Sequence, residues 1–202
     1  MTRLRQILEF PSVYRLLGAI AVGRTNGRAV YASQHLKPRP HERVLDLGCG
    51  PGDMLSVLPD CEYVGVDVDE RYIDAARARF GSRGTFHCMP VEDVVLEAPR
   101  AFDLVMANGV LHHLDDRQAD AMLRLAAAAM KDDGRTVTLD GCYLEGQSRI
   151  AKAFLDWDRG KFVRDQAAYL SLARVHFKEV RAEIRHDLLS FPYTHIIMTC
   201  RR

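Results

Sequence analysis

The 202-residue chain lacks an excess of charge of either sign, since 28 lysine and arginine residues stand against 27 aspartate and glutamate residues. An extended basic face for nucleic acid is therefore not expected. None of its five cysteines forms a C-x-x-C pair, which argues against a zinc site or a disulfide framework and favours a reducing, cytoplasmic setting. No apolar run approaches the length of a membrane span, and no tight cluster of metal ligands is evident.

The N-terminus lacks the uninterrupted apolar run of a secretory signal. Arg3 precedes an apolar stretch at residues 16–22, which gives a superficial similarity to such a signal. Glu9, Pro11 and Arg15 break up the run that a signal peptide requires. We therefore expect no signal peptide.

What the chain does have is a glycine-rich stretch, VLDLGCGPG, at residues 44–52. Its apolar start is typical of a buried parallel strand, and its three glycines allow a tight turn and the close approach of a ligand to the main chain. A second strand, predicted at residues 63–67, ends in Asp67, which lies 19 residues after Gly48. A carboxylate at that offset can accept hydrogen bonds from the ribose hydroxyls of an adenosine ligand.

The acid Asp46, the glycine elbow and Asp67 together resemble the first two motifs of the class I S-adenosylmethionine-dependent methyltransferases, in particular the small bacterial methyltransferase-11/25-like members. A dinucleotide oxidoreductase more often has G-x-G-x-x-G, with its third glycine one position later. The resemblance implies S-adenosyl-L-methionine as the cofactor. It also implies a Rossmann-like α/β fold with a doubly wound, mostly parallel seven-stranded sheet and an antiparallel last strand.

The remaining pattern of apolar residues is consistent with this fold. It predicts helices at residues 13–20, 29–36, 53–58, 70–80, 116–131 and 167–175, and further strands at 85–88, 101–107, 136–139, 179–185 and 195–200. The sequence Asp-Asp-Gly at residues 132–134 is interpreted as a turn. Two strands at the end of the chain favour the methyltransferase sheet, because a dinucleotide-binding domain would continue strand-helix-strand.

We expect a single domain, in which residues 1–42 form an N-terminal helical lid and residues 43–202 form the core. Two short helices before the core resemble the lid of the family. Simple packing of an N-terminal extension is an equal alternative, and a membrane-surface helix is disfavoured because the polar face carries little excess charge. Residues 141–165 are interpreted as a segment that covers the pocket, with a solvated connection as the alternative.

The resemblance also implies a set of cofactor-binding residues. They match the family's motifs at Asp46, Gly48, Cys49, Gly50, Asp67, Val68, Val91, Glu92, Asn108 and Gly109. In the family the loop at residues 89–93 packs on the adenine, often with an aspartate where Pro90 stands here. Glu92, or the backbone of Val91 and Glu92, is therefore expected to replace that carboxylate.

A stretch with two histidines follows the fourth strand, at the carboxyl edge where ligands bind in open α/β sheets. It resembles the family's fourth motif, but not the (D/N)-P-P-(Y/F) motif of enzymes that methylate amino groups of DNA bases. The family position matching His113 recurs, which implies that it fixes the loop, whereas that matching His112 varies with the acceptor. We therefore predict His112 as base or orienter. Asp140 or Tyr143, or positioning without any base, are the alternatives.

The sequence thus predicts a metal-independent methyltransferase that O- or N-methylates a small molecule, without stable membrane insertion. A protein that binds S-adenosylmethionine without methyl transfer, such as a sensor or a divergent enzyme, is one alternative. A dinucleotide oxidoreductase is the other. Tyrosines, arginines and Trp157 in the expected pocket segments suit an aromatic, sugar-like or acidic acceptor about equally.

Overall fold

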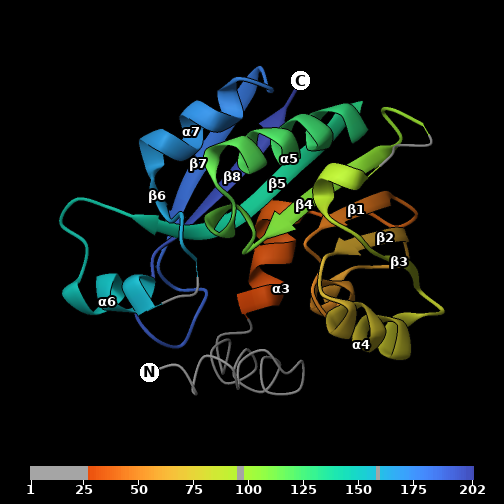
Figure 1. Ribbon diagram of the computed structural model, residues 1–202, viewed down its shortest axis with the longest axis horizontal. Helices are drawn as coiled ribbons and strands as arrows, with labels where there is room; N and C mark the ends of the chain where they lie inside the picture. Colours follow the sequence, from red (N-terminus) through yellow and green to blue (C-terminus); the bar gives the residue numbers. More distant parts are fainter. Residues whose placement is uncertain (1–26, 95–97, 158–159) are drawn as a thin grey trace.

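A single mixed sheet organises the computed structural model, which describes residues 27–94, 98–157 and 160–202 (Figure 1). The strand order is β3-β2-β1-β4-β5-β8-β7, and a short β6 pairs with β5. The strands are β1 (Arg43–Leu47), β2 (Glu62–Asp67), β3 (Gly84–Cys88), β4 (Phe102–Asn108), β5 (Met130–Tyr143), β6 (Arg164–Asp165), β7 (Glu179–Arg185) and β8 (His195–Arg201). Strands β1 to β5 are parallel and β8 is antiparallel to both its neighbours, which confirms the predicted fold class.

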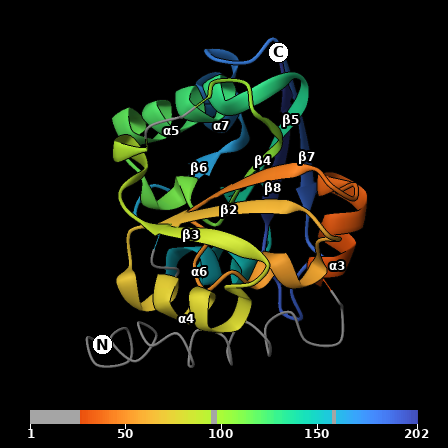
Figure 2. The same cartoon turned by 90° about the vertical axis from the view of Figure 1, so that its right-hand side faces the viewer.

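Helices cover both faces of the sheet (Figures 1 and 2). They are α3 (Gly27–Tyr31), the π-helix η2 (Ala32–Leu36), α4 (Glu70–Phe80), α5 (Asp116–Ala129), α6 (Arg149–Trp157) and α7 (Gln166–Arg174), with short 3₁₀ turns η3 (Asp53–Val57), η4 (Val91–Asp93) and η5 (Leu111–His113). The helix predicted at residues 13–20, and with it most of the expected lid, lies outside the described residues.

Two hydrophobic cores result, one on each face of the sheet. Successive residues of a strand point to opposite faces, so Leu45 and Leu47 of β1 join the core under α5 and α7, whereas Val44 joins the core with α3 and α4. Because strand β1 is buried on both faces, its sequence is a nearly continuous apolar run. Asp46 interrupts that run on the α4 side, where it bonds to Tyr63.

Helix starts follow from the side chains that cap them. Asp115 accepts a hydrogen bond from the backbone N–H of Gln118 at 2.8 Å, and the Gln118 side chain accepts one from the Asp115 N–H at 3.3 Å. This capping box starts α5 at the predicted residue. Asp69 caps α4 in a similar way, and that helix has the predicted bounds.

Several segments differ from the sequence expectation. The helix predicted at residues 53–58 is the short 3₁₀ turn η3, and β6 was not predicted. Strand β5 extends over residues 130–143 instead of 136–139, because the Asp-Asp-Gly stretch predicted as a turn is accommodated inside the strand, where the pairing with β4 shifts register between Phe102 and Leu104. No helix was predicted within residues 141–165, yet they contain helix α6, which buries Ala151 and Leu155 at a spacing of four residues.

None of the helices within the described ranges is long and apolar enough to cross a membrane.

A buried ion pair attaches the N-terminal helices to the sheet. Arg135 of β5 donates to both carboxylate oxygens of Glu42 at 2.9 Å, and also to the carbonyl oxygens of Leu36 at 2.6 Å and Lys37 at 2.9 Å. The Arg135 and Glu42 side chains are only 9% and 8% exposed. The guanidinium thus joins the end of η2, the approach to β1 and the middle of the sheet.

We expect Glu42→Ala to lower the free energy of unfolding by about 3–5 kcal/mol, because it leaves the buried guanidinium without its anion. Glu62→Ala is the matched control, since it removes the partner of Arg43 in a pair whose Glu62 side chain is 72% exposed. That loss should be about 1 kcal/mol or less. Urea denaturation of the three proteins measures both values, and equal losses would contradict the structural role assigned to Glu42.

Candidate active site

The glycine elbow lies directly after β1, at the carboxyl edge of the sheet. Gly48, Gly50 and Gly52 all have positive φ angles, of 75°, 53° and 74°. A Cβ on Gly48 would collide with the side chain of Val110, whereas a Cβ on Gly50 would meet no atom within 4 Å. Gly48 is therefore needed for packing and backbone angle, and Gly50 leaves open space above the main chain.

The acid Asp67 is joined to this elbow. Its Oδ2 accepts a hydrogen bond from the Gly50 N–H at 2.8 Å, and its Oδ1 accepts one from the Asp69 N–H at 2.9 Å. Burial raises the pKa of the Asp67 carboxyl, and the two backbone hydrogen bonds counteract that rise. Each carboxylate oxygen can accept a second hydrogen bond, so the group retains capacity for the hydroxyls of a ligand.

Asp46 and Cys49 lie beneath the elbow. Both side chains are buried, and Asp46 Oδ2 accepts a hydrogen bond from the Tyr63 hydroxyl at 2.7 Å. Asp46 Oδ1 is buried without a hydrogen-bond partner among the described residues. Burial raises the pKa of Asp46 to about 7; the bond from Tyr63 lowers it and the charge of Asp67 raises it further. These two predicted cofactor residues thus support the elbow from below.

Val68, Val91 and Glu92 lie around the ends of β2 and β3. Val68 follows Asp67 directly and is 70% exposed. Val91 and Glu92 belong to η4, where Val91 is half-buried and Glu92 is exposed. Asp67 and the last residue of β3 are paired in register, so these predicted adenine contacts share one corner of the sheet.

At the end of β4, Asn108 is held by a residue of α3. Tyr31 is buried, and its hydroxyl donates to Asn108 Oδ1 at 2.6 Å. Asn108 Nδ2 is buried and has no hydrogen-bond partner within the part of the chain that the structure describes. Gly109 follows with φ 72° and donates its N–H to the Leu139 carbonyl. The Tyr31–Asn108 bond spans 77 residues, and sequence reasoning did not identify it.

His112, the predicted base, is buried in η5 and bonded to Asp140 of β5. Its Nδ1 lies 2.9 Å from Asp140 Oδ1, which also accepts the His112 backbone N–H at 3.2 Å. His113 is exposed, and the two bonds of His112 hold η5 to the end of β5. Burial raises the pKa of Asp140, and its hydrogen bond and charge interaction with His112 lower it. Asp140 was expected only as a substitute base, and its position as the partner of His112 is new.

Part of the 141–165 segment lies over this histidine. A Cβ on Gly160 would collide with the His112 ring, and the Phe162 N–H donates to the His112 carbonyl at 2.9 Å. Arg164 donates to the carbonyl oxygens of Leu111 and Leu114 on either side. The segment therefore limits access of water to the imidazole. Within the described ranges, no group of three or more potential ligands could hold a metal ion.

Comparisons with known proteins agree with this geometry. Residues 45–136 match a family described as a methyltransferase domain. The chain is 28% identical over 119 residues to a ubiquinone biosynthesis O-methyltransferase of Chromobacterium violaceum, covering 56% of this chain and 48% of that protein. A ribosomal RNA small subunit methyltransferase C of Stutzerimonas stutzeri is 25% identical over 147 residues, covering 69% and 44%.

The fold comparison gives the same architecture. Haemonchus contortus phosphoethanolamine N-methyltransferase 2, in complex with phosphomonomethylethanolamine and S-adenosylhomocysteine, superposes with a TM-score of 0.75 at 14% identity, over 98% of this chain and 59% of that one. The chain spans less than half the length of the curated relatives it matches.

The raised pKa of Asp46 predicts a pH-dependent stability. Because the folded-state pKa of about 7 lies above the ordinary value of 3.8, the folded protein binds the extra proton, and the stability from Asp46 is lost as pH rises through this window. Between pH 4 and pH 8, the free energy of unfolding of the wild type should fall by on the order of 4 kcal/mol relative to that of Asp46→Asn. Thermal and urea unfolding measure the difference.

The exposed carboxylate of Asp74 provides the control. Asp74→Asn should show a difference from wild type that changes little over the same range of pH. If the free energy of unfolding of Asp46→Asn also differed from that of the wild type by the same amount at every pH, Asp46 would ionise in the folded protein as it does in the unfolded chain.

Proposed function

We propose that this chain, which belongs through residues 45–136 to the class I S-adenosylmethionine-dependent methyltransferases, methylates a small molecule. S-adenosyl-L-methionine is the cofactor. The observation that carries the proposal is the hydrogen bond from the Gly50 N–H to the Asp67 carboxylate. It places that carboxylate beside the open space above Gly50. Because no side chain occupies the space above Gly50, a ligand can approach the main chain there.

The residues present fit an adenosyl ligand. Asp67 retains lone pairs for two ribose hydroxyls, and the exposed Val68 supplies an apolar surface for a base beside it. Asn108 Nδ2 is a buried donor without a partner among the described residues, near the elbow, which suits a polar end of the ligand. We infer that Asp46 and Cys49 act by supporting the elbow, and that Val91 and Glu92 contact the base.

The cofactor supplies a sulfonium-activated methyl group. The chain must hold the acceptor in line with that group, exclude water and take up the acceptor's proton. Asp140 accepts the Nδ1–H of His112, which leaves Nε2 of the imidazole as the proton-accepting atom. The proton of the acceptor's O–H or N–H would pass to Nε2 while the methyl carbon left the sulfonium sulfur for the acceptor atom, and S-adenosylhomocysteine would be released. We therefore propose His112 as the base and Asp140 as its positioning residue.

A small acceptor is favoured over nucleic acid by the nearly balanced charge of the chain. The ubiquinone relative, by its name an O-methyltransferase, supports oxygen as the accepting atom. The similarity to a protein named as a ribosomal RNA methyltransferase favours a nucleic-acid acceptor instead. RNA is therefore the second candidate acceptor. The cytoplasmic setting, the lid at residues 1–42 and the core at 43–202 stay predictions.

Isothermal titration calorimetry tests the cofactor assignment. We expect S-adenosylhomocysteine to bind and NAD not to bind comparably. Gly50→Ala should weaken S-adenosylhomocysteine binding at least tenfold, because the added methyl group occupies the space above the elbow. Gly146→Ala is the matched control: Gly146 also has a positive φ, of 71°, and open space, but lies far along the chain from the elbow. Preferential binding of NAD, or equal effects of the two substitutions, would overturn the assignment.

Kinetics test the base. His112→Ala should lower kcat by roughly 100-fold with an accepted methyl acceptor, because the proton then has no positioned acceptor, while S-adenosylhomocysteine affinity stays within a few-fold. Asp140→Asn should lower kcat and alter the pH–rate profile, because the amide can favour the wrong tautomer. His113→Ala, at an exposed position, is the control and should retain activity. Normal turnover by His112→Ala would leave positioning alone as the mechanism.

A further inference from the structure

Arg164 of β6 lies beside the turn that carries the candidate base, and its side chain is only 9% exposed. Nη1 donates to the carbonyl oxygens of Leu111 at 2.9 Å and Phe162 at 3.0 Å. Nη2 donates to the Leu114 carbonyl at 2.8 Å, and both Nη2 and Nε donate to Asp116 Oδ1, at 2.7 and 3.0 Å. A guanidinium has five N–H donors, so these contacts use all of them.

These bonds hold the turn η5 at both ends. Arg164 bonds to the carbonyl groups of Leu111 and Leu114, and between them the His112 carbonyl accepts the Phe162 N–H at 2.9 Å. Carbonyl groups in the last turn of a helix need partners from outside the helix. Because η5 is a single turn of three residues, its position depends on contacts of this kind.

The backbone of Arg164 is itself fixed to the end of β5 (Figure 1). It pairs with Cys142, two residues after Asp140. The next residue, Asp165, caps helix α7 through its side chain. Arg164 therefore connects the stretch of β5 that supplies Asp140 to the turn that supplies His112.

This connection matters because the imidazole and its carboxylate come from different elements. His112 Nδ1 lies 2.9 Å from Asp140 Oδ1, and both side chains are buried. Such a bond weakens steeply when its distance or angle departs from the preferred geometry. A catalytic group displaced by about 1 Å can cost roughly 100-fold in rate. A group that sets the position of η5 therefore also sets the position of the imidazole.

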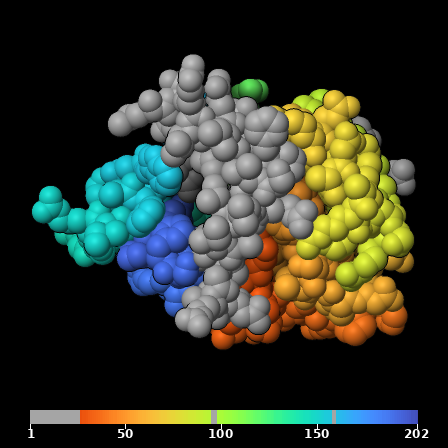
Figure 3. Space-filling view, turned by 90° about the horizontal axis from the view of Figure 1, so that it is seen from below, coloured from red at the N-terminus to blue at the C-terminus, as the bar shows by residue number. Residues whose placement is uncertain are grey.

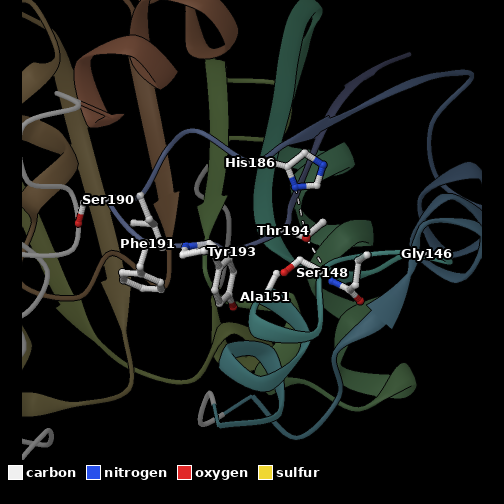
Figure 4. A pocket seen from close by; sticks show the side chains of 11 residues that line it. Gly146, Ser148, Ala151, His186, Ser190, Phe191, Tyr193 and Thr194 are labelled. Carbon is white, nitrogen blue, oxygen red and sulfur yellow. Dashed lines mark hydrogen bonds between the residues drawn. The ribbon is translucent and has the colours of Figure 1, made fainter.

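The contacts of Arg164 distinguish it from an arginine that binds an anionic acceptor. A carboxylate or phosphate would have to displace one of its five bonds. A cavity of about 570 Å³ lies elsewhere, between the start of α6 and the β7–β8 loop (Figure 4), which lie side by side on one face of the molecule (Figure 3). Tyr193 of its wall packs against Gly141, on the face of β5 opposite to Asp140.

We propose that Arg164 is a positioning residue for His112: its guanidinium fixes η5 against the end of β5, so that the imidazole meets Asp140. The proposal rests on the function proposed above, because it explains how the proposed base is held. It also removes Arg164 from the arginines that could recognise an acidic acceptor.

NMR of the full chain with isotopically labelled histidine observes the imidazole directly, without a methyl acceptor. The His112 Nδ1–H, held by Asp140, should exchange slowly with solvent in the wild type, and its signal is identified by its loss in His112→Gln. Arg164→Lys should raise the exchange rate roughly tenfold, because the three donors of lysine lie on one nitrogen and cannot span the two ends of η5. Circular dichroism establishes that the variant is folded.

Two further variants make this measurement specific. Arg83→Lys is the matched control, since Arg83 also donates to three backbone carbonyls, all within residues 55–59, and it should leave the exchange rate unchanged. Asp116→Ala removes a partner of Arg164 that is 82% exposed, so this variant should fold even where Arg164→Lys does not. It should raise the exchange rate about threefold.

An unchanged exchange rate in folded Arg164→Lys would overturn the proposal. If that variant does not fold, an unchanged rate in Asp116→Ala would do so. Equal increases in Arg83→Lys and Arg164→Lys would also overturn it, because they would indicate a general loosening of the fold.

Kinetics separate positioning from a purely structural role. With an accepted methyl acceptor, Arg164→Lys should lower kcat roughly 10–100-fold, while S-adenosylhomocysteine affinity stays within a few-fold. In the His112→Ala background the same substitution should change kcat by less than about twofold, because the residue that it positions is gone. A loss of the same size in both backgrounds would mean that Arg164 does not act through His112.

The outcomes also separate this proposal from the proposed function. If Arg164→Lys speeds the exchange but His112→Ala turns over normally, Arg164 positions His112 and the assignment of the base is wrong. If S-adenosylhomocysteine does not bind, the proposed methyl transfer fails, and the exchange rates still decide the role of Arg164.

Discussion

The hydrogen bond between Gly50 N and Asp67 Oδ2 joins the two halves of the cofactor corner. It connects the turn after β1 to the end of β2, and it can form only because the elbow has the backbone angles of glycine. The same carboxylate also accepts the Asp69 N–H at the start of α4. One group thus sets the position of the elbow, the strand end and the next helix. The cofactor residues proposed farther along the chain, Asn108 and Gly109, lie at the end of the neighbouring strand β4.

The N-terminal helices are part of the site through two long-range contacts. Tyr31 reaches across to Asn108 at the end of β4, and Arg135 fastens the end of η2 to Glu42. The first contact holds a polar side chain beside the elbow, and the second keeps the helix that carries Tyr31 against the sheet. Residues 27–36 are therefore attached to the sheet by two hydrogen-bonded contacts, one of which holds the Asn108 side chain.

The end of β5 depends on a different constraint, the close packing around Gly141. Tyr193 from the β7–β8 loop and Leu155 from α6 both approach this glycine, so segments far apart in the sequence share one wall. Asp140, immediately before it, points to the other face of the sheet and holds His112. A single stretch of β5 thereby supports the proposed base on one face of the sheet and the packing of α6 with the β7–β8 loop on the other.

Local sequence determined the elements whose signals are complete within a few residues. The elbow at residues 48–52, the acid Asp67, the α4 bounds and the Asp115 cap were predicted because backbone angles, strand periodicity and capping are local properties. Tertiary structure decided the rest: the long β5 with its register shift, helix α6, and the partners of Asn108 and His112. The partners of His112 and Asn108 depend on contacts between residues 28 and 77 positions apart, which leave no periodic mark in either segment. The burial of His112 rather than His113 has the same cause, because only the position of β5 determines which of two adjacent imidazoles meets a carboxylate.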